Sequence, residues 1–501
     1  MPVSYKLNLT ETGRPYPHYW ELCVGSCHAA TILREDVREH IRKAHAECGF
    51  EYLSFHGLLD DDMSVVIQPM FFGEAQISFF NIDSIFDFLL DTGMKPFVEI
   101  GFMPEAFASG PDTLFHYKAN RTPPKDYDQW ADFIRQFGQH LLDRYGKDEV
   151  SRWFFEVWNE PNLAFFFSGS QNEYFKLYKT TAEALKSVDP CFRVGGPATS
   201  NNAWVADFVD FCRRENVPVD FVSTHHYPSD DPLQSFGKND ETQPVFSLPS
   251  KEELEKMTPE EIGKLTAAFG NRENKNPRDI LLQMTKKAKA EAGDLPLYYT
   301  EWNGSKEFDT SYQAAAVVHT LSQNEGLVEG YSFWTVSDIF EEMGLMGSPF
   351  NNAFGIQTIH GIPKPSYRVF ETLHQAGSMR LDVDGSHATA EVLALKNGSR
   401  VTVLVYNHDI ERRCIKAEDI ELTLQGRIRS IHKAVIDDTH TNPLGAWQAM
   451  GSPKYPTPEQ LAVIRGASEL DYELLDIDGS DSHTLTFTAE PESVTVLQIE
   501  L

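Results

Sequence analysis

Eight short apolar segments separated by helical sequence constrain the fold of this chain most. We expect strands near Glu21–Val24, Tyr52–Phe55, Pro96–Phe102, Trp153–Trp158, Arg193–Gly196, Asp220–Thr224, Leu297–Thr300 and Tyr331–Thr335. Their continuous apolar character is typical of parallel strands buried on both faces. Apolar spacing of i, i+3 and i+4 predicts helices at Leu33–Ala46, Tyr127–Tyr145, Tyr174–Val188, Ala203–Arg213, Ile280–Ala290 and Ala314–Gln323. This alternation predicts an α/β fold, a (β/α)8 TIM barrel over residues 15–376.

The pattern changes after about Gly377, where short alternating strands follow one another. They lie at Ala388–Leu395, Arg400–His408, Ile420–Leu424, Ile428–Asp437, Thr484–Thr488 and Ser493–Leu501. Such strands, separated by turn residues, predict a smaller β-sandwich over residues 377–501. The alternating stretch Val3–Leu9 predicts a strand that joins residues 1–14 to this sandwich. We expect Thr439–Glu469 to be a long irregular connection.

Composition excludes several classes of partner. The chain of 501 residues carries 74 acidic and 44 basic side chains, a net charge of −30, which argues against nucleic acid and anionic membranes as partners. It has no apolar run of membrane-spanning length and no apolar signal-like stretch in Met1–Pro17, so we expect a cytoplasmic protein.

Six scattered cysteines without paired CxxC spacing predict free thiols. We expect neither a metal nor a cofactor, and a homo-oligomer remains open.

Two of the expected strands end in a carboxylate beside an asparagine. One reads Trp158-Asn159-Glu160-Pro161-Asn162, and the other Thr300-Glu301-Trp302-Asn303. Because the carboxyl ends of barrel strands face one mouth, Glu160 and Glu301 can meet in a single pocket. A pair of carboxylates is what cleavage of a glycosidic bond requires. Two unrelated strand-end acids are the alternative, since such acids are common in barrels, but the flanking Trp and Asn favour a pair.

These two segments resemble the catalytic signatures of glycoside hydrolase clan A. The wider chain resembles family 39, and most closely its β-xylosidases. The similarity includes His56–Leu59, Pro96–Pro104, Thr122–Tyr127, Val194–Ala198, Val219–Ser223 and Ile362–Pro365. The resemblance implies a retaining, exo-acting glycoside hydrolase that releases β-linked xylose from the non-reducing end of short xylo-oligosaccharides by double displacement.

The resemblance also implies roles for individual residues. Glu160 would be the general acid/base, Glu301 the nucleophile, and Asn159 the partner of the sugar 2-hydroxyl. Trp334 would form a flat floor under the sugar ring. The remaining pocket residues would be His56, His225, Tyr227, Glu341 and Glu342. Because neighbouring strand residues face opposite ways, His225 and Tyr227 are expected to point inward and His226 outward.

Each of these side chains has an alternative interpretation. His56 and Trp334 are also residues of ordinary cores, and Glu341-Glu342 is also typical of a solvated turn. The His225-His226 pair invites a metal site, but no HExxH motif or third ligand accompanies it. We expect Asp61, Asp62 and Glu99 to be structural residues near the mouth. The polar stretch Pro228–Asn276 predicts an enlarged active-site loop with its own helix.

The chain departs from the pattern of family 39 at three positions. Ser54 and Thr224 stand where arginines are common, and Lys306 stands where a tyrosine is common. These positions bear on the sugar, so a β-galactoside, an arabinoside or an α-L-iduronide remains an alternative substrate. A uronide carboxylate would need a cationic partner, and Glu341 and Glu342 argue against that choice. A non-catalytic carbohydrate-binding barrel is the remaining alternative.

Overall fold

The fold is described from a computed structural model. It describes residues 2–67, 75–230, 276–304, 306–342, 344, 347–410, 414–477 and 479–501. The enlarged loop and helix expected in Pro228–Asn276 lie, from residue 231 to residue 275, outside the described residues.

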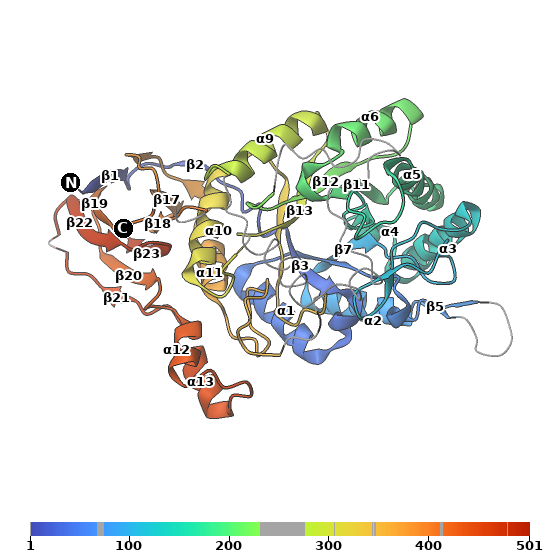
Figure 1. The fold of residues 1–501 in the computed structure, drawn as a ribbon. Helices are drawn as coiled ribbons and strands as arrows, with labels where there is room; N and C mark the ends of the chain where they lie inside the picture. The colour runs from blue at the N-terminus through green and yellow to red at the C-terminus, as the bar shows by residue number, and fades with distance from the viewer. Residues whose placement is uncertain are drawn as a thin grey trace.

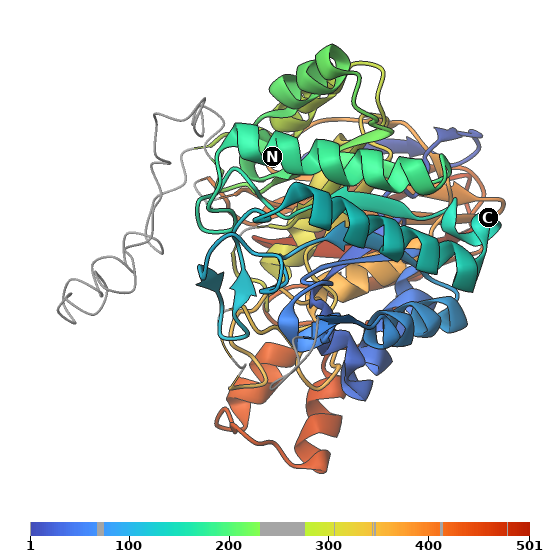
Figure 2. The ribbon, with the colours of Figure 1, turned by 90° about the vertical axis from the view of Figure 1, so that its right-hand side faces the viewer.

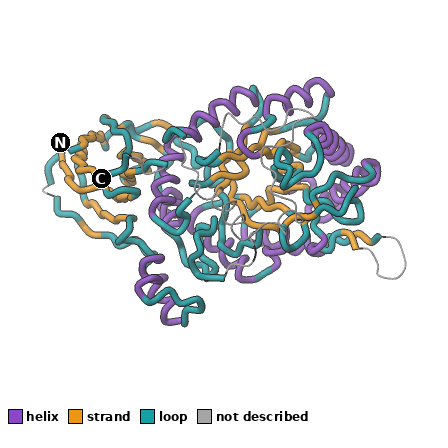
Figure 3. The backbone as a smooth tube through the Cα atoms, in the orientation of Figure 1, coloured by secondary structure: helices purple, strands orange, loops and turns teal. Residues whose placement is uncertain are grey.

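Eight parallel strands close into a barrel, as the sequence predicts, and helices surround it (Figures 1 and 3). The barrel strands are β3 (Cys23–His28), β4 (Tyr52–His56), β7 (Lys95–Ile100), β10 (Phe154–Val157), β11 (Arg193–Thr199), β12 (Phe221–His226), β13 (Leu297–Trp302) and β14 (Gly330–Phe333). Each pairs in parallel with its neighbours in chain order, and β14 pairs with β3 to close the ring. The predicted strands are confirmed, with ends displaced by a few residues.

The helices of the outer layer bury their apolar faces against the strands. They are α1 (Glu35–Cys48), α2 (Phe80–Thr92), α3 (Tyr127–Tyr145), α4 (Lys147–Val150), α5 (Gln171–Val188), α6 (Val205–Glu215), α9 (Ile280–Ala292), α10 (Ser311–Gln323) and α11 (Pro365–Gln375). The six predicted helices are confirmed. Ser170 and Glu173 form a capping box at the start of α5, which satisfies backbone donors that the first turn leaves free. Among the described helices, none combines the length and apolarity needed to cross a bilayer.

The interior of the barrel is apolar at one end and polar at the other. Phe97 pairs with Phe154 across β7 and β10, and together with Phe221 they belong to an aromatic cluster at the amino ends of the strands. Two residues further along the same strands, Glu99 pairs with Glu156. Because side chains alternate along a strand, these carboxyl groups lie in the barrel interior above the aromatic cluster.

Two antiparallel-rich sheets form the second unit, beside α10 and α11 in Figure 1. The first sheet contains β16 (Val383–Asp384), β1 (Val3–Asn8), β19 (Glu418–Gln425) and β22 (Ser482–Ala489). The second contains β2 (Arg14–Pro15), β15 (Met379–Arg380), β17 (Ala390–Asn397), β18 (Arg400–Asn407), β23 (Ser493–Glu500), β20 (Ser430–Ile436) and β21 (Glu473–Leu474). The amino-terminal strand β1 pairs in parallel with β19. Two-stranded ribbons also occur at β5 (Val66–Ile67) with β6 (Gln76–Ile77), and at β8 (Thr113–Leu114) with β9 (Ala119–Asn120).

Strand β18 is apolar on both faces. Val403 and Val405 belong to the core between the two sheets, whereas Leu404 and Tyr406 belong to the core that continues into the barrel. The opposite faces of one strand therefore serve two cores, which explains why this segment lacks a clean polar alternation.

The connection Thr439–Glu469 is not irregular, contrary to the expectation. It contains α12 (Pro443–Ala449) and α13 (Pro458–Gly466), which project from the rest of the molecule (Figure 2). Asn442 and Thr457 cap these helices, and a proline occupies the first turn of each. The two helices are short and bury few apolar residues, so their sequences show little apolar periodicity. Their capping residues and first-turn prolines were the sequence features that could have predicted them.

Candidate active site

The backbone just beyond β10 turns sharply and thereby orients Glu160. Trp158 and Glu160 both have positive φ, 72° and 45°, an unusual conformation for side-chain-bearing residues that costs roughly 1–3 kcal/mol at each position. The Glu160 amide donates to the carbonyl of Ala198 at 2.8 Å, and the Trp158 indole donates to the carbonyl of Phe166 at 3.1 Å. These bonds hold the strained turn and direct Glu160 to the barrel mouth.

A bulge in β13 places two consecutive residues at the interior. Thr224 of β12 pairs with Tyr299, but the next residue, His225, pairs with Glu301, so Thr300 is the extra residue. A bulge re-aims side chains that strict alternation would send to opposite faces. Thr300 contacts the buried polar layer, and Glu301 reaches the mouth.

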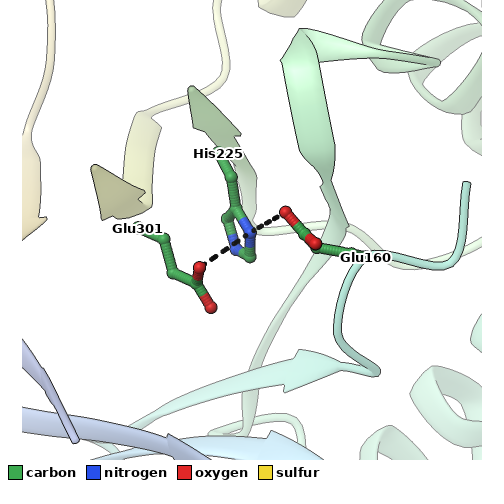
Figure 4. Close-up of side chains that lie close together, drawn as sticks. All are labelled: Glu160, His225 and Glu301. Carbon is green, nitrogen blue, oxygen red and sulfur yellow. Dashed lines mark hydrogen bonds and ion pairs between the residues drawn. The ribbon is translucent and has the colours of Figure 1, made fainter. Parts of the chain in front are cut away.

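His225 lies between the two carboxyl groups (Figure 4). Its Nδ1 is 3.1 Å from Oε1 of Glu160 and 3.6 Å from Oε2 of Glu301. One oxygen of each carboxyl group and a ring nitrogen of His225 all lie within 4.8 Å of one another. Carboxyl groups about 5–5.5 Å apart are typical of retaining glycosidases, whereas inverting enzymes keep them about 6.5–9.5 Å apart. The spacing here fits the retaining geometry.

Burial dominates the electrostatics of Glu301. Burial, reinforced by the charge of Glu160, raises the pKa of Glu301 to about 7, although His225 lowers it. The Tyr227 hydroxyl donates to Oε2 of Glu301 at 2.7 Å, which also favours the ionised carboxylate. Glu301 therefore titrates close to neutral pH.

Glu160, Tyr227 and Glu301 line a pocket of about 270 Å³. The described residues that line it are Asn159, Glu160, Phe166, Tyr227, Ser229, Glu301, Asn303, Trp334, Glu342 and Phe354. Asn159 is buried, and its side-chain oxygen has no hydrogen-bond partner among the described residues. No lysine or arginine is part of this described lining. The pocket offers aromatic faces and hydrogen-bonding groups, which suit a neutral polar ligand.

The buried His56 contacts Glu342, which is partly exposed and lines the pocket. Nε2 of His56 is 3.2 Å from Oε1 of Glu342 and 3.2 Å from the Tyr117 hydroxyl. Burial lowers the pKa of His56 to about 3 and raises the pKa of Glu342 well above its usual value. Both shifts favour the neutral forms of the two groups, so their contact is better described as a hydrogen bond than as an ion pair.

Glu341 lies apart from the other predicted residues. Its carboxylate is 3.8 Å from Arg34, 3.8 Å from His116 and 3.9 Å from His28. It is not among the residues that line the pocket. The structure thus brings together Asn159, Glu160, Tyr227, Glu301, Trp334 and Glu342, with His225 and His56 in contact with members of this set, and leaves Glu341 outside the described lining.

A buried ion cluster supports the loops that carry Trp334 and Glu342. Nζ of Lys364 is 2.6 Å from Asp309 and 2.7 Å from Asp338, and it donates to the carbonyl of Ala353 at 2.9 Å. All three charged side chains are nearly inaccessible to solvent. The cluster ties the segments after β13 and β14 to the start of α11.

The positions at which the chain departs from the family pattern point away from the pocket or lie below it. Ser54 is fully buried in β4, and the Thr224 hydroxyl donates to the carbonyl of Thr199 at 2.8 Å. The Lys306 ammonium lies over the Tyr312 ring at 5.4 Å. His226 also faces outward, stacked on Tyr299.

Asp61 and Asp62 lie near the mouth but outside the lining of the pocket. Asp61 accepts from the backbone amide of Glu105, and Asp62 is 3.1 Å from His28. Sequence reasoning did not single out Phe166, Ser229, Thr300 or Tyr117. The run Phe165-Phe166-Phe167 in a polar loop directly after Glu160 was the available signal for the first of these.

Glu160, His225 and Glu301 could also be considered as metal ligands, because each offers one ligand atom within the same 4.8 Å. A metal needs a histidine nitrogen free of its proton. Burial lowers the pKa of His225, but the carboxylates around it, Glu301 first, outweigh burial and raise this pKa to about 9. The electrostatics therefore favour a protonated histidine rather than a ligand.

Comparisons with known proteins agree with this geometry. The model of "Glycosyl hydrolases family 39" matches residues 3–267 and 266–475. A beta-xylosidase from Caldicellulosiruptor saccharolyticus is 44% identical over 96% of this chain and 95% of its own, and one from Geobacillus stearothermophilus is 35% identical over 92% and 88%. The crystal structure of a monomeric beta-xylosidase from Caulobacter crescentus CB15 superposes with a TM-score of 0.81 at 30% identity, covering 99% of both chains. This chain therefore belongs to glycosyl hydrolase family 39.

Proposed function

We propose that this protein is a retaining, exo-acting β-xylosidase that releases xylose from the non-reducing end of short xylo-oligosaccharides. The observation that best supports this chemistry is that Glu160 and Glu301 line the same pocket, with one oxygen of each within 4.8 Å of the other. Two relatives that align along most of this chain are beta-xylosidases, which supports xylose as the sugar.

In the first step, Glu301 attacks the anomeric carbon. The bond between that carbon and the leaving oxygen breaks as the new C–O bond to Glu301 forms, and Glu160 transfers its proton to the leaving oxygen. The reactive form therefore carries its proton on Glu160 and its charge on Glu301. Tyr227 favours that charge through its hydrogen bond to Glu301.

In the second step, a water molecule attacks the same carbon. Its proton passes to Glu160, the ester bond to Glu301 breaks, and xylose leaves with the β-configuration of the substrate. Glu160 must now be the charged carboxylate. His225 contacts both carboxyl groups and can therefore stabilise the negative charge in either step.

The pocket favours a neutral sugar over a uronide. A uronide carboxylate would enter a site that already holds two carboxyl groups of the catalytic pair, without a lysine or arginine in the described lining. Trp334 supplies an aromatic face, and Asn159 and Glu342 supply polar groups for the sugar hydroxyls. We assign the oxygen of Asn159 to the sugar 2-hydroxyl, since it lacks a protein partner among the described residues.

The catalytic residues all lie in residues 15–376. We propose that residues 377–501, together with residues 1–14, support this barrel without contributing to the pocket. The described lining residues fit that division, since they lie between Asn159 and Phe354.

A panel of nitrophenyl glycosides tests the proposed sugar. We expect the β-xyloside to be hydrolysed best and its product to be the β-anomer, as NMR of the first turnover would show. A strong preference for a galactoside, an arabinoside or an iduronide would overturn the choice of xylose. Formation of the α-anomer would overturn the retaining mechanism.

Azide distinguishes the two catalytic roles. In Glu301→Ala, azide attacks the substrate directly, so one inversion gives the α-xylosyl azide. In Glu160→Ala with an activated aryl xyloside, azide attacks the covalent intermediate, so two inversions give the β-xylosyl azide. The reverse pattern would exchange the roles of Glu160 and Glu301.

A further inference from the structure

A chain of hydrogen bonds runs from the catalytic pair into the buried polar layer of the barrel. Nδ1 of His225 faces Glu160 at 3.1 Å, and its Nε2 faces the Thr300 hydroxyl at 3.1 Å. That hydroxyl in turn donates to Oε1 of Glu156 at 3.0 Å. All of these side chains are buried, so water does not compete for their bonds.

The direction in which the Thr300 hydroxyl donates decides whether Nε2 of His225 carries hydrogen. A hydroxyl has one proton, and an ionised carboxylate can only accept. If Thr300 donates to Glu156, its oxygen must accept from Nε2 of His225. Nδ1 lies 3.1 Å from Glu160 and 3.6 Å from Glu301, and one of these two groups is ionised in each step. When Nδ1 donates to the ionised group, both ring nitrogens carry hydrogen and the ring is an imidazolium.

This argument requires that Glu156, rather than its neighbour Glu99, carries the charge of their pair. The two residues are paired across β10 and β7. Burial, and then the charge of Glu156, raise the pKa of Glu99 well above its usual value. Burial raises the pKa of Glu156 as well, but His225 and the hydrogen bond from Thr300 lower it. We therefore assign the proton of the pair to Glu99, because the Thr300 hydroxyl donates to Glu156 and so favours the charge there.

We infer that Glu156, acting through Thr300, is a positioning residue that keeps His225 as an imidazolium between the two catalytic carboxyl groups. This inference rests on the proposed function and deepens it. During double displacement one negative charge moves from Glu301 in the first step to Glu160 in the second. A fixed positive charge in contact with both carboxyl groups stabilises each charged form in turn.

The bulge in β13 is what makes this arrangement available. Because Thr300 is the extra residue of that strand, its hydroxyl reaches His225 and Glu156 while Glu301 still faces the pocket. Without the bulge, alternation would send Thr300 and Glu301 to opposite faces.

Other groups also act on His225, and the test must separate them. The carboxyl groups near it are Glu156, Glu160, Glu301 and Asp230, and the histidines near it are His56 and His226. Only Glu156 reaches Nε2 through a hydroxyl. Changes at Thr300 and Glu156 therefore probe the inferred link without altering the side chains that line the pocket.

The direct test is NMR of 13C-labelled histidine in the full-length protein without substrate, with the His225 signal assigned from a His225→Asn variant. We expect His225 to remain an imidazolium at pH 7. Thr300→Val has nearly the same shape but no hydroxyl, and we expect it to make His225 neutral at that pH. Thr300→Ser restores the hydroxyl and should restore the imidazolium.

Glu156→Gln and Glu99→Gln form a matched pair, because the two residues are neighbours in one layer and undergo the same isosteric change. We expect Glu156→Gln to lower the pH at which His225 titrates and Glu99→Gln to leave it nearly unchanged. A neutral His225 in the wild type, or equal effects of the two variants, would overturn the inference. Thr300→Val provides the same answer if Glu156→Gln does not fold.

Kinetics supply a second readout. Loss of the imidazolium removes a positive charge next to Glu301, so we expect the acid limb of kcat/KM for a β-xyloside to move up by about one pH unit or more in Thr300→Val. In Thr300→Ser the acid limb of kcat/KM should return to its wild-type pH. An imidazolium without xyloside hydrolysis would overturn the proposed function alone, whereas hydrolysis with a neutral His225 would overturn the inference alone.

Discussion

The mouth of the barrel and the centre of the sandwich are both buried, but they differ in chemistry. The sandwich core is built of aliphatic side chains, among them Val403, Leu422 and Leu497. The barrel mouth and the polar layer below it bury the carboxyl groups of Glu99, Glu156, Glu160 and Glu301. Burying aliphatic surface stabilises a fold, whereas burying a charge opposes folding unless it is compensated. The comparison therefore distinguishes residues that stabilise the fold from residues that serve the chemistry of the site.

The largest expected effect is on catalysis by Glu301→Ala. We expect kcat/KM for an aryl β-xyloside to fall by at least about 10³-fold, because the variant has no nucleophile. We also expect the free energy of unfolding at pH 8 to be undiminished, since a buried carboxyl group is removed. Steady-state kinetics and urea unfolding at that pH check the two halves. A destabilised variant would show that Glu301 contributes to the fold, against the comparison.

Leu422→Ala should show the opposite behaviour. Leu422 is fully buried between the sandwich sheets, and its truncation is expected to reduce the free energy of unfolding by about 2–5 kcal/mol. The kcat of the folded fraction should stay at the wild-type value, because Leu422 does not line the pocket. Urea unfolding and kinetics on the same sample measure both quantities. A large loss of kcat would mean that the sandwich affects the geometry of the active site.

The difference between segments buried for packing and residues buried for chemistry also explains which features the sequence could predict. The eight barrel strands and the carboxylates at the ends of β10 and β13 follow from continuous apolar runs that stop at Glu-containing signatures. Burial on both faces produces such runs directly. The capped helices α12 and α13 were not predicted, because helices of this length with little buried surface have almost no apolar periodicity.

The polar layer under the site could not be predicted in detail. Strict alternation along β13 sends Thr300 and Glu301 to opposite faces, and only the bulge at Thr300 brings both inside. Register shifts of this kind depend on the pairing partner rather than on local sequence. Glu341 illustrates the same limit, since a loop residue adjacent to Glu342 turned to His28 and Arg34 instead of the pocket.

The pH dependence of stability sharpens the comparison further. The folded pKa of Glu301, about 7, lies above the usual value of 4.5. Its contribution to stability is therefore present below pH 4.5 and is lost as the pH rises through 7, a change of about 3 kcal/mol at roughly 1.4 kcal/mol per pH unit.

The side chain introduced in Glu301→Gln does not titrate. The free energy of unfolding of this variant, relative to that of the wild type, should therefore increase by about 3 kcal/mol between pH 4.5 and pH 8. Urea unfolding at several pH values measures the difference. Leu422→Ala is the control, because it removes no titrating group and its deficit should stay constant. A difference between Glu301→Gln and the wild type that does not change with pH would contradict the elevated pKa.

Tyr227→Phe has the smallest expected effect and tests the link between pocket and charge. It removes the hydrogen bond to Glu301, and bonds to charged groups contribute about 1.5–3 kcal/mol, so kcat should fall by about 10–100-fold. The acid limb of kcat/KM should also move to higher pH, because the bond lowers the pKa of Glu301. Tyr331→Phe is the matched control, since that hydroxyl contacts His226 on the outer side of the barrel. Equal losses of kcat in both variants would show that general packing, rather than the charge of Glu301, accounts for the effect.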